Sequence, residues 1–283
     1  MDNIEIYNDK ILNMVSYYLN NCERALDNKS IKPLIDCGLS EQDAFSVFFS
    51  TFFDVKDREF EKLYIKNMIH LLSEKEYKNN AYYKNIKFPK VKNKEWELKN
   101  AYYSPYELFV KDDFIFKGKQ VIPNLGFFNK KFEYPAVFQN DRLWMSVTPN
   151  EINTMKEPIN NAKGKVLTFG LGLGYFPYMC QLKNNVESVT IVERDKTIID
   201  MFNKYILPQF ENKEKISIIN EDAYEFLNKM KDGQYDYCFI DIYHDAGDGI
   251  DVYLKTKQHR DRLKNTKIEY WIEKTIKYYN YET

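Results

Sequence analysis

The sequence is poor in the residues that build disulfide frameworks and metal centres. It has four cysteines and three histidines in 283 residues, and its formal net charge is -1. No two cysteines form a Cys-x-x-Cys pair, and Cys180 and Cys238 lie inside apolar runs, which predicts buried thiols rather than a disulfide or zinc framework. His70, His244 and His259 give no histidine-based metal cluster, so no metal is predicted. The balanced charge excludes a global attraction to nucleic acid or to an anionic membrane.

Long apolar runs are also absent. No run approaches the roughly 20 residues that a membrane-spanning helix needs. The first residues, Met1 to Glu5, lack the features of a signal peptide. We therefore expect a cytoplasmic protein without membrane contact. At 44% hydrophobic and 16% aromatic residues, the chain can bury the core of one large or two ordinary domains.

The first half of the chain changes its hydrophobic period. Helical spacing predicts helices over 4–28, from Ser40 through an aromatic stripe, and over 59–72. Residues 75–99 mix lysines with tyrosines, a composition that favours a solvated connector and leaves single-stranded nucleic acid as the alternative ligand. From residue 113 the period becomes two, which predicts a small antiparallel β element with strands at 114–116, 120–122, 132–138 and 143–147.

The segment Thr148-Pro149-Asn150-Glu151 reads as the start of a helix. Thr148 fits the N-cap position, Pro149 the first helical position, and Glu151 the acidic partner of a capping box. We place a domain boundary here. Residues 1–147 then form a helical and β-hairpin region, and residues 148–283 form a nucleotide-binding domain.

The second half alternates between strands and helices. Strands are predicted at 166–169, 188–193, 216–219 and 235–241, with 267–272 as a fifth candidate. Continuous apolar strands separated by helices are typical of a parallel sheet with both faces covered. The expected fold class is therefore α/β, with a doubly wound (Rossmann-like), mainly parallel sheet that is short at its C-terminal end.

Three glycines follow the first of these strands at every second position. Gly170, Gly172 and Gly174 lie between the strand and a helix predicted over 175–184. A glycine turn lets a ligand approach the backbone closely, and the helix start offers free N–H groups to an anion or nucleotide. The alternative is a tight turn that binds nothing.

Acidic residues follow the next three strands. Glu193 ends the second strand, Asp222 follows the third, and Asp241 ends the fourth. Since ligands of doubly wound folds lie at the carboxyl ends of the strands, these acids and the glycines are expected to meet around one ligand. A carboxylate at the end of the second strand can accept hydrogen bonds from both ribose hydroxyls. For Asp222 the alternative is a helix cap.

The glycine spacing argues against a dinucleotide. A Gly-x-Gly-x-x-Gly pattern needs glycine where Tyr175 or Pro177 stands. The Gly-x-Gly-x-Gly form with its three acids instead resembles class I S-adenosylmethionine-dependent methyltransferases, and within them the spermidine synthase-like branch. The segments 189–195, 220–227 and 235–242 follow the strand, acid and helix pattern of that branch. The similarity covers roughly residues 130–250.

The resemblance implies roles for individual residues. The glycines would face the amino-acid part of S-adenosylmethionine, Glu193 its ribose, Asp222 and Ala223 its adenine, and Asp241 its sulfonium and amino group. The implied cofactor-binding residues are Gly170, Leu171, Gly172, Gly174, Tyr175, Glu193, Arg194, Asp222, Ala223 and Asp241.

The loop after the fourth strand departs from the branch. Polyamine synthases carry Asp-Ser-Ser/Thr-Asp there, whereas this chain has Asp241-Ile-Tyr-His-Asp245, with the second acid one position late. The predicted catalytic residues are Asp241, Tyr243, which would position a nucleophile, and His244, which would accept its proton. The equal alternative is that His244 and Asp248 satisfy backbone groups of the loop.

Three functions compete. The leading hypothesis is a methyltransferase with S-adenosylmethionine as cofactor and an unidentified acceptor. The second is a polyamine aminopropyltransferase-like enzyme, and the third is a non-catalytic nucleotide-binding or assembly protein. The expected partner is a small-molecule substrate, with nucleic acid and a homodimer left open.

Overall fold

The chain folds into two compact units, each made of segments that are separate in sequence. The computed structural model describes residues 3–280. Unit 1 comprises Met1–Glu76 and Tyr102–Glu133, and unit 2 comprises Tyr77–Ala101 and Tyr134–Thr283. The domain boundary that the sequence predicts after residue 147 stays a prediction.

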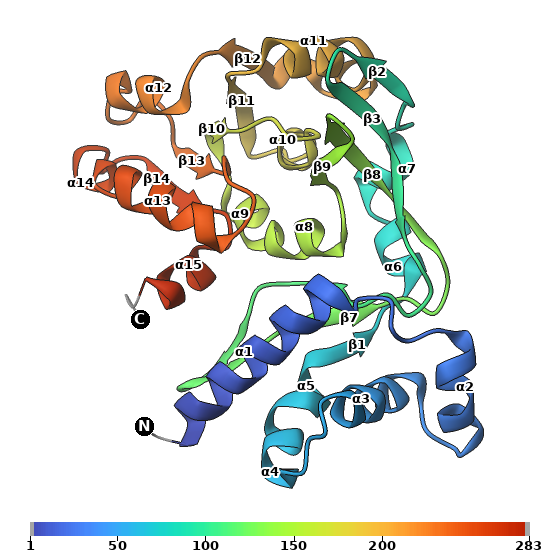
Figure 1. Cartoon of the computed structure of the whole chain (residues 1–283). Coiled ribbons are helices and arrows are strands. Elements are labelled where there is room, and N and C mark those ends of the chain that lie inside the picture. Colours follow the sequence, from blue (N-terminus) through green and yellow to red (C-terminus); the bar gives the residue numbers. More distant parts are fainter. Residues whose placement is uncertain (1–2, 281–283) are drawn as a thin grey trace. The chain divides into compact units, whose positions relative to one another are not determined.

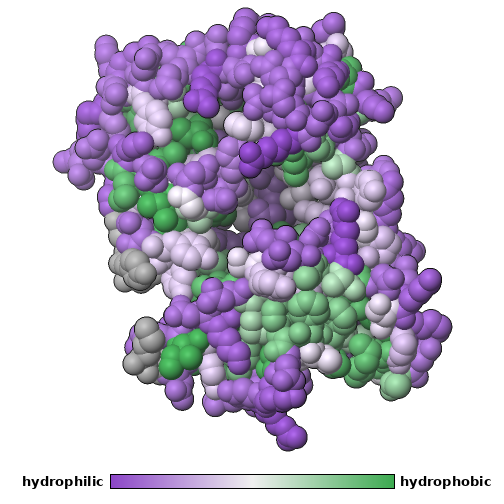
Figure 2. Space-filling view, viewed as in Figure 1, coloured by the Kyte–Doolittle hydropathy of each residue, from purple (hydrophilic) through white to green (hydrophobic). Residues whose placement is uncertain are grey.

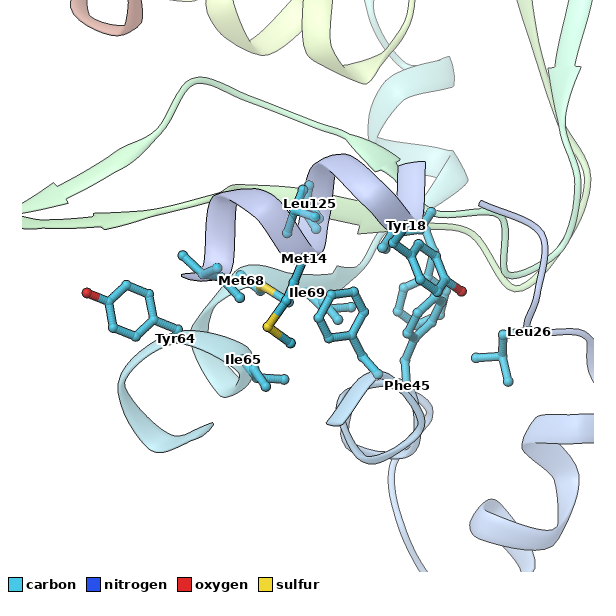
Figure 3. Close-up of a cluster of buried hydrophobic side chains, with 14 of the residues drawn as sticks. Met14, Tyr18, Leu26, Phe45, Tyr64, Ile65, Met68, Ile69 and Leu125 are labelled. Atoms are coloured by element: carbon cyan, nitrogen blue, oxygen red, sulfur yellow. The ribbon is translucent and has the colours of Figure 1, made fainter. Parts of the chain in front are cut away.

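Unit 1 surrounds an aromatic core with helices and short strands (Figure 1). Phe45 and Phe49 are completely buried, and the Phe45 ring lies 4.8 Å from that of Phe127. Met14, Tyr18 and Phe45 lie together in this core (Figure 3), so the aromatic stripe is a packing surface. The elements are α1 (Asn3–Asn21), α2 (Asn28–Asp36), α3 (Glu41–Phe52), α4 (Arg58–Phe60), the π-helical turn η1 (Glu61–Ile65), α5 (Lys66–Met68), α6 (Glu74–Lys78, which crosses into unit 2), β1 (Ile69–Leu71), β4 (Phe109–Val110), β5 (Ile115–Lys117), β6 (Gln120–Ile122) and β7 (Leu125–Phe127).

The predicted helix over 59–72 is too long. Helical backbone stops at Met68, and Ile69–Leu71 forms β1, which pairs in parallel with β7. The helical spacing of 59–72 does not reveal this change, because the strand depends on a partner more than 50 residues away in sequence. The predicted start of α3 is confirmed, since the Ser40 side chain caps it by accepting a hydrogen bond from the N–H of Asp43.

The lysine-rich segment is not a solvated connector. It contains α7 (Ala81–Asn85), β2 (Val91–Asn93) and the first part of β3 (Trp96–Tyr103). Tyr82 is completely buried, packs edge-on against Tyr175 and Tyr178, and donates a 2.6 Å hydrogen bond to the Leu173 carbonyl. The segment therefore forms part of the core of unit 2.

A five-stranded parallel sheet forms the centre of unit 2. The strand order is β12-β11-β10-β13-β14, and the predicted α/β fold with a mainly parallel sheet is confirmed. The chain steps outward from β10 to β12 and then returns to the other side of β10, so the connection reverses between β10 and β13. The strands are β10 (Gly164–Phe169), β11 (Val186–Glu193), β12 (Ile216–Asn220), β13 (Tyr237–Ile240) and β14 (Lys267–Tyr270).

Both faces of this sheet are covered. Successive residues of a strand point to opposite faces, so neighbouring residues of β13 contact different helices. On one face, Cys238 and Ile240 join a core with α12, α13 and α15. On the other face, the Phe239 ring stacks on Phe176 of α10 at 4.5 Å. The helices and turns are α8 (Pro149–Thr154), α9 (Lys156–Asn161), α10 (Tyr175–Gln181), α11 (Lys196–Tyr205), η2 (Leu207–Gln209), η3 (Lys213–Lys215), α12 (Ala223–Lys229), α13 (Ala246–Thr256), α14 (His259–Arg262) and α15 (Glu273–Tyr279).

A second, four-stranded sheet in the order β2-β3-β8-β9 contributes to unit 2. It includes β8 (Phe132–Gln139), whose first two residues belong to unit 1, and β9 (Arg142–Ser146). β9 runs antiparallel to β8 and carries Trp144 and Met145. The Met145 sulfur lies where a side chain on Gly172 would stand. This sheet therefore reaches the glycine turn of the parallel sheet.

The surface of unit 2 over α11 and β12 is largely hydrophilic (Figure 2). Cys180 and Cys238 are completely buried, as predicted. Within residues 3–280, no helix has both the length and the apolar character that crossing a membrane requires.

Candidate functional site

The glycine turn has a backbone conformation that residues with a side chain rarely adopt. Gly170, Gly172 and Gly174 have φ angles of +93°, +50° and +74°. A Cβ atom on Gly170 would lie 2.1 Å from the carbonyl oxygen of Asp241. The turn is held between neighbouring strands, since Gly170 donates to the Val192 carbonyl at 3.0 Å and Asp241 donates to the Phe169 carbonyl at 3.1 Å. Close packing therefore requires glycine at all three positions: Gly170 against the residue after β13, Gly172 against Met145 and Gly174 against Phe202.

Glu193 is oriented by the backbone of this turn. Its Oε2 accepts a 3.2 Å hydrogen bond from the N–H of Leu171, and its Oε1 accepts a 2.8 Å bond from the N–H of Asp195. Each carboxylate oxygen can accept more than one hydrogen bond. Glu193 can thus hold the turn and still accept hydrogen bonds from a diol.

Asp222 caps α12, as the alternative interpretation expected. Its Oδ1 accepts hydrogen bonds from the N–H groups of Tyr224 at 2.8 Å and Glu225 at 3.2 Å. Both bonds use the same oxygen, so Oδ2 is available to a ligand. The cap fixes the carboxylate at the rim of a cavity, and capping and ligand binding are compatible here.

Asp241 and Glu151 form an acidic pair deeper in the site. Burial raises the pKa of Asp241 to about 7. Burial, and then the charge of Asp241, raise the pKa of Glu151 well above its usual range. The two carboxyl groups therefore interact, and at neutral pH they do not both ionise fully.

The polar residues of the loop after β13 make different contacts. His244 Nδ1 lies 3.1 Å from Oδ2 of Asp248, and the Trp144 ring meets the imidazole edge-on at 4.4 Å. Asp245 and Asp248 form a capping box at the start of α13. The hydroxyl of Tyr243 donates to the Trp271 carbonyl, so its proton is not directed at a ligand.

These residues surround one cavity of about 510 Å³ at the carboxyl ends of the parallel strands. Five acidic side chains line it, whereas its lining contains one arginine and no lysine. A cavity of this size accommodates a small molecule, and its charge favours a cation. The charged and titratable lining residues are Glu151, Glu193, Arg194, Glu221, Asp222, Tyr224, Asp241, Tyr243 and His244.

Most of the predicted site residues meet in this cavity. Gly170, Gly172, Ala223 and the predicted acids line it, as do Arg194, Tyr243 and His244. Three predicted cofactor-binding residues are not part of its lining. Leu171 contributes its N–H to Glu193, Gly174 packs against Phe202, and Tyr175 is buried with its hydroxyl accepting a hydrogen bond from Asn80.

The sequence pattern missed Glu151 because it assigned that residue to a capping box. Thr148 and Pro149 do occupy the N-cap and first helical positions of α8, but Thr148 makes no side-chain capping bond. Glu151 lines the cavity instead. Trp144 and Trp271 were also missed, since only the folded chain places β9 and the end of β14 beside the glycine turn.

Comparisons with known proteins point to one family. Residues 160–268 match the family described as the spermine/spermidine synthase domain. The polyamine aminopropyltransferase of Alkaliphilus oremlandii (strain OhILAs) is 26% identical over 153 residues, which cover 51% of this chain and 53% of that relative. The chain thus spans about half the length of the curated relative that it matches.

Two solved structures are also similar. One is spermidine synthase from Thermotoga maritima, 17% identical, with a TM-score of 0.34, covering 47% of this chain and 48% of that one. The other is spermidine synthase in complex with the transition state analogue AdoDATO, 18% identical, with a TM-score of 0.31, covering 40% of this chain and 43% of that one.

The sequence matches contradict the leading functional hypothesis. The matched family and the curated relative are named for polyamine synthesis and aminopropyl transfer, not for methyl transfer. The predicted methyltransferase is therefore wrong, and the second hypothesis agrees better with both matches. The predicted cofactor S-adenosylmethionine is contradicted together with it, because it is the donor for methyl transfer, whereas the curated relative is named for aminopropyl transfer.

Proposed function

We propose that this chain transfers an aminopropyl group from decarboxylated S-adenosylmethionine to an amine of a polyamine, releasing methylthioadenosine. The observation that carries the proposal is the acidic cavity at the carboxyl ends of β10, β11 and β13. The donor carries a sulfonium and an ammonium, and a polyamine carries further ammonium groups. All of these are cations, and the match to the spermine/spermidine synthase domain covers this part of the chain.

The donor would lie along the glycine turn in a Rossmann-like arrangement. Glu193, already oriented by Leu171 and Asp195, would accept hydrogen bonds from the ribose hydroxyls. Asp222 would accept one from the adenine amine through its free Oδ2. Gly170 and Gly172 allow the sulfur end to approach the backbone closely.

The reaction is a displacement at carbon. The lone pair of the acceptor nitrogen forms a bond to the methylene carbon attached to sulfur. The carbon–sulfur bond breaks, and its electron pair returns to sulfur, which leaves as neutral methylthioadenosine. An ammonium has no lone pair, so the acceptor must lose a proton before it attacks.

His244 is the group in the loop best placed to receive that proton. Asp245 uses Oδ1 to accept hydrogen bonds from the N–H groups of Gly247 and Asp248. Asp245 is not part of the cavity lining, in contrast to His244. His244 lines the cavity, and Asp248 fixes its ring through Nδ1, which leaves Nε2 as the proton acceptor.

The test is to incubate the purified chain with decarboxylated S-adenosylmethionine and putrescine. Mass spectrometry should detect methylthioadenosine and spermidine in equal amounts. Replacing the donor by S-adenosylmethionine should give no methylated product. The proposal is overturned if no methylthioadenosine forms with putrescine, spermidine or longer diamines.

A further inference from the structure

The carbonyl of Leu173, in the middle of the glycine turn, is bonded by a side chain from a distant segment. Tyr82 of α7 donates a 2.6 Å hydrogen bond to it from its hydroxyl. Tyr82 and Leu173 are 0% and 1% exposed, so water has no access to replace this hydroxyl. Neither residue is part of the cavity lining, and the bond therefore holds the turn from outside the cavity.

The turn needs such an outside contact because its own backbone is permissive. Leu173 lies between Gly172 and Gly174, which have φ angles of +50° and +74°. Glycine adopts several backbone conformations at similar cost, so the peptide plane between Leu173 and Gly174 can rotate unless a bond holds it. The helix that follows cannot supply the donor, because the residue four positions after Leu173 is Pro177, which has no N–H. The Tyr82 hydroxyl takes that place.

The same peptide continues a line of hydrogen bonds to Glu193. A peptide group is planar, so a bond that fixes the Leu173 carbonyl also fixes the N–H of Gly174. That N–H donates to the Leu171 carbonyl at 2.9 Å, and the N–H of Leu171 donates to Oε2 of Glu193 at 3.2 Å. Tyr82 is thereby connected, through the turn, to the carboxylate that would accept the ribose hydroxyls.

The helix that carries Tyr82 is bonded to α10 on both sides of this residue. Asn80 caps α7 by accepting a 2.9 Å hydrogen bond from the N–H of Tyr82, and its amide donates to the Tyr175 hydroxyl at 2.9 Å. Asn85, the last residue of α7, donates to the Tyr178 hydroxyl at 2.9 Å. The Tyr82 ring packs edge-on against the rings of Tyr175 and Tyr178. These contacts fix the hydroxyl of Tyr82 relative to the start of α10.

Resting on the proposed function, we propose that Tyr82 is a positioning residue for the aminopropyl donor. Its hydroxyl orients the glycine turn, and the turn orients Glu193 toward the ribose hydroxyls. Because Tyr82 lies outside the cavity, it contributes to binding of the nucleoside part of the donor and not to the transfer step or to acceptor binding. The lysine-rich segment from the first half of the chain thus supports the donor site.

The experiment starts from Tyr82→Phe, which removes the hydroxyl and keeps the packing of the ring. The donor KM and the methylthioadenosine Kd should rise by roughly 3- to 10-fold, the loss of one neutral hydrogen bond. The putrescine KM, and kcat at saturating donor, should stay at their wild-type values. Steady-state kinetics and calorimetry provide these readouts. Tyr237→Phe is the matched control: Tyr237 is 1% exposed, and its hydroxyl donates to Glu269 at the start of β13, the strand end opposite the cavity.

A double variant tests the connection to Glu193. If Tyr82 acts through this carboxylate, adding Tyr82→Phe to Glu193→Gln should weaken methylthioadenosine binding by no more than about twofold further. Independent effects would multiply, so a further loss of roughly 3- to 10-fold would overturn the inference.

The outcomes separate the two proposals. A Tyr82→Phe chain with lower thermal stability but an unchanged donor KM would show a purely structural role, and equal increases of the donor and putrescine KM would show a general distortion. Either result overturns this inference and leaves the proposed function standing. A wild-type chain that binds methylthioadenosine without turnover overturns the proposed function alone, and the binding data then decide the inference. A wild-type chain that does not bind methylthioadenosine overturns both.

Hydrogen exchange of the wild-type chain decides the inference if Tyr82→Phe does not fold. Methylthioadenosine should slow amide exchange in residues 171–175 and in residues 80–85 together, because the Tyr82 hydroxyl joins the two segments. Slower exchange confined to residues 171–175 would overturn the inference.

Discussion

His244 and Asp248 are joined by a 3.1 Å contact between Nδ1 and Oδ2, and the same carboxylate completes the capping box at the start of α13. Burial opposes ionisation of Asp248, but hydrogen bonds from the Asp245 backbone and from His244 outweigh it and lower its pKa. The helix start therefore supplies a charged, fixed partner for the imidazole. In the proposed reaction this partner holds the base toward the cavity.

His244→Ala should slow aminopropyl transfer by roughly 100-fold near neutral pH, the lower end of the effect of a general base. The deficit should shrink as the pH rises toward 9, because more of the acceptor amine is then already neutral. Steady-state rates with putrescine from pH 7 to 9 measure this. His259→Ala on α14, outside the cavity lining, should behave as wild type. A deficit that is the same at every pH would contradict the assigned role.

Glu193→Gln should weaken methylthioadenosine binding by about tenfold or more, because an amide replaces a charged acceptor. In either orientation of the new amide, its NH2 group would face the backbone N–H of Leu171 or of Asp195. One hydrogen bond would be lost, so thermal stability should fall modestly. Calorimetry and thermal unfolding provide the two readouts. Glu187→Gln, exposed on the same strand, is the control. Unchanged binding in Glu193→Gln would remove this residue from the nucleotide site.

Patterns local to the chain were sufficient for the parallel sheet and for most of the cavity. The strands ending at Phe169, Glu193 and Ile240 consist of apolar runs, and parallel strands bring their carboxyl ends to one edge. The acids that follow those strands are therefore neighbours in any such fold. That is why Glu193, Asp222 and Asp241 could be predicted to surround one ligand.

Glu151 was beyond the reach of the same reasoning. Thr148 and Glu151 have the spacing of a capping box, and nothing within that segment reveals that the packing of α8 buries the carboxylate beside Asp241. The helix predicted over 59–72 was wrong at Ile69–Leu71 for a related reason, since pairing with β7 makes this segment a strand. Both errors arise where a distant part of the chain overrides a local pattern.

The stability of unit 2 should fall as the pH rises, through the acidic pair. A carboxyl whose folded pKa is raised contributes stability that is present below its unfolded pKa, near 4, and is lost as the pH passes its folded pKa, about 7 for Asp241. Glu151→Gln removes one acid and the repulsion. Relative to wild type, its free energy of unfolding should therefore improve by about 1 to 3 kcal/mol between pH 5.5 and pH 8.

Tryptophan fluorescence can follow this change in urea. All three tryptophans, at positions 96, 144 and 271, belong to unit 2, so the signal reports on that unit. Glu157→Gln should show the wild-type pH dependence, because Glu157 is exposed and paired with Lys274. Parallel pH curves for wild type and Glu151→Gln would contradict the interaction between the two acids.

Gly170→Ala should destabilise unit 2 more than Gly233→Ala. Both glycines have positive φ angles, +93° and +71°, so each alanine carries the backbone cost of about 1 to 2 kcal/mol. A Cβ atom on Gly170 would also lie 2.1 Å from the Asp241 carbonyl oxygen, whereas the nearest atom to one on Gly233 is 3.8 Å away. Overpacking of this kind adds about 1 to 3 kcal/mol. Urea unfolding followed by tryptophan fluorescence compares the two variants, and equal losses would show that the turn is not held against β13. Since the displaced carbonyl belongs to Asp241, Gly170→Ala should also lower donor affinity, while Gly233→Ala should not.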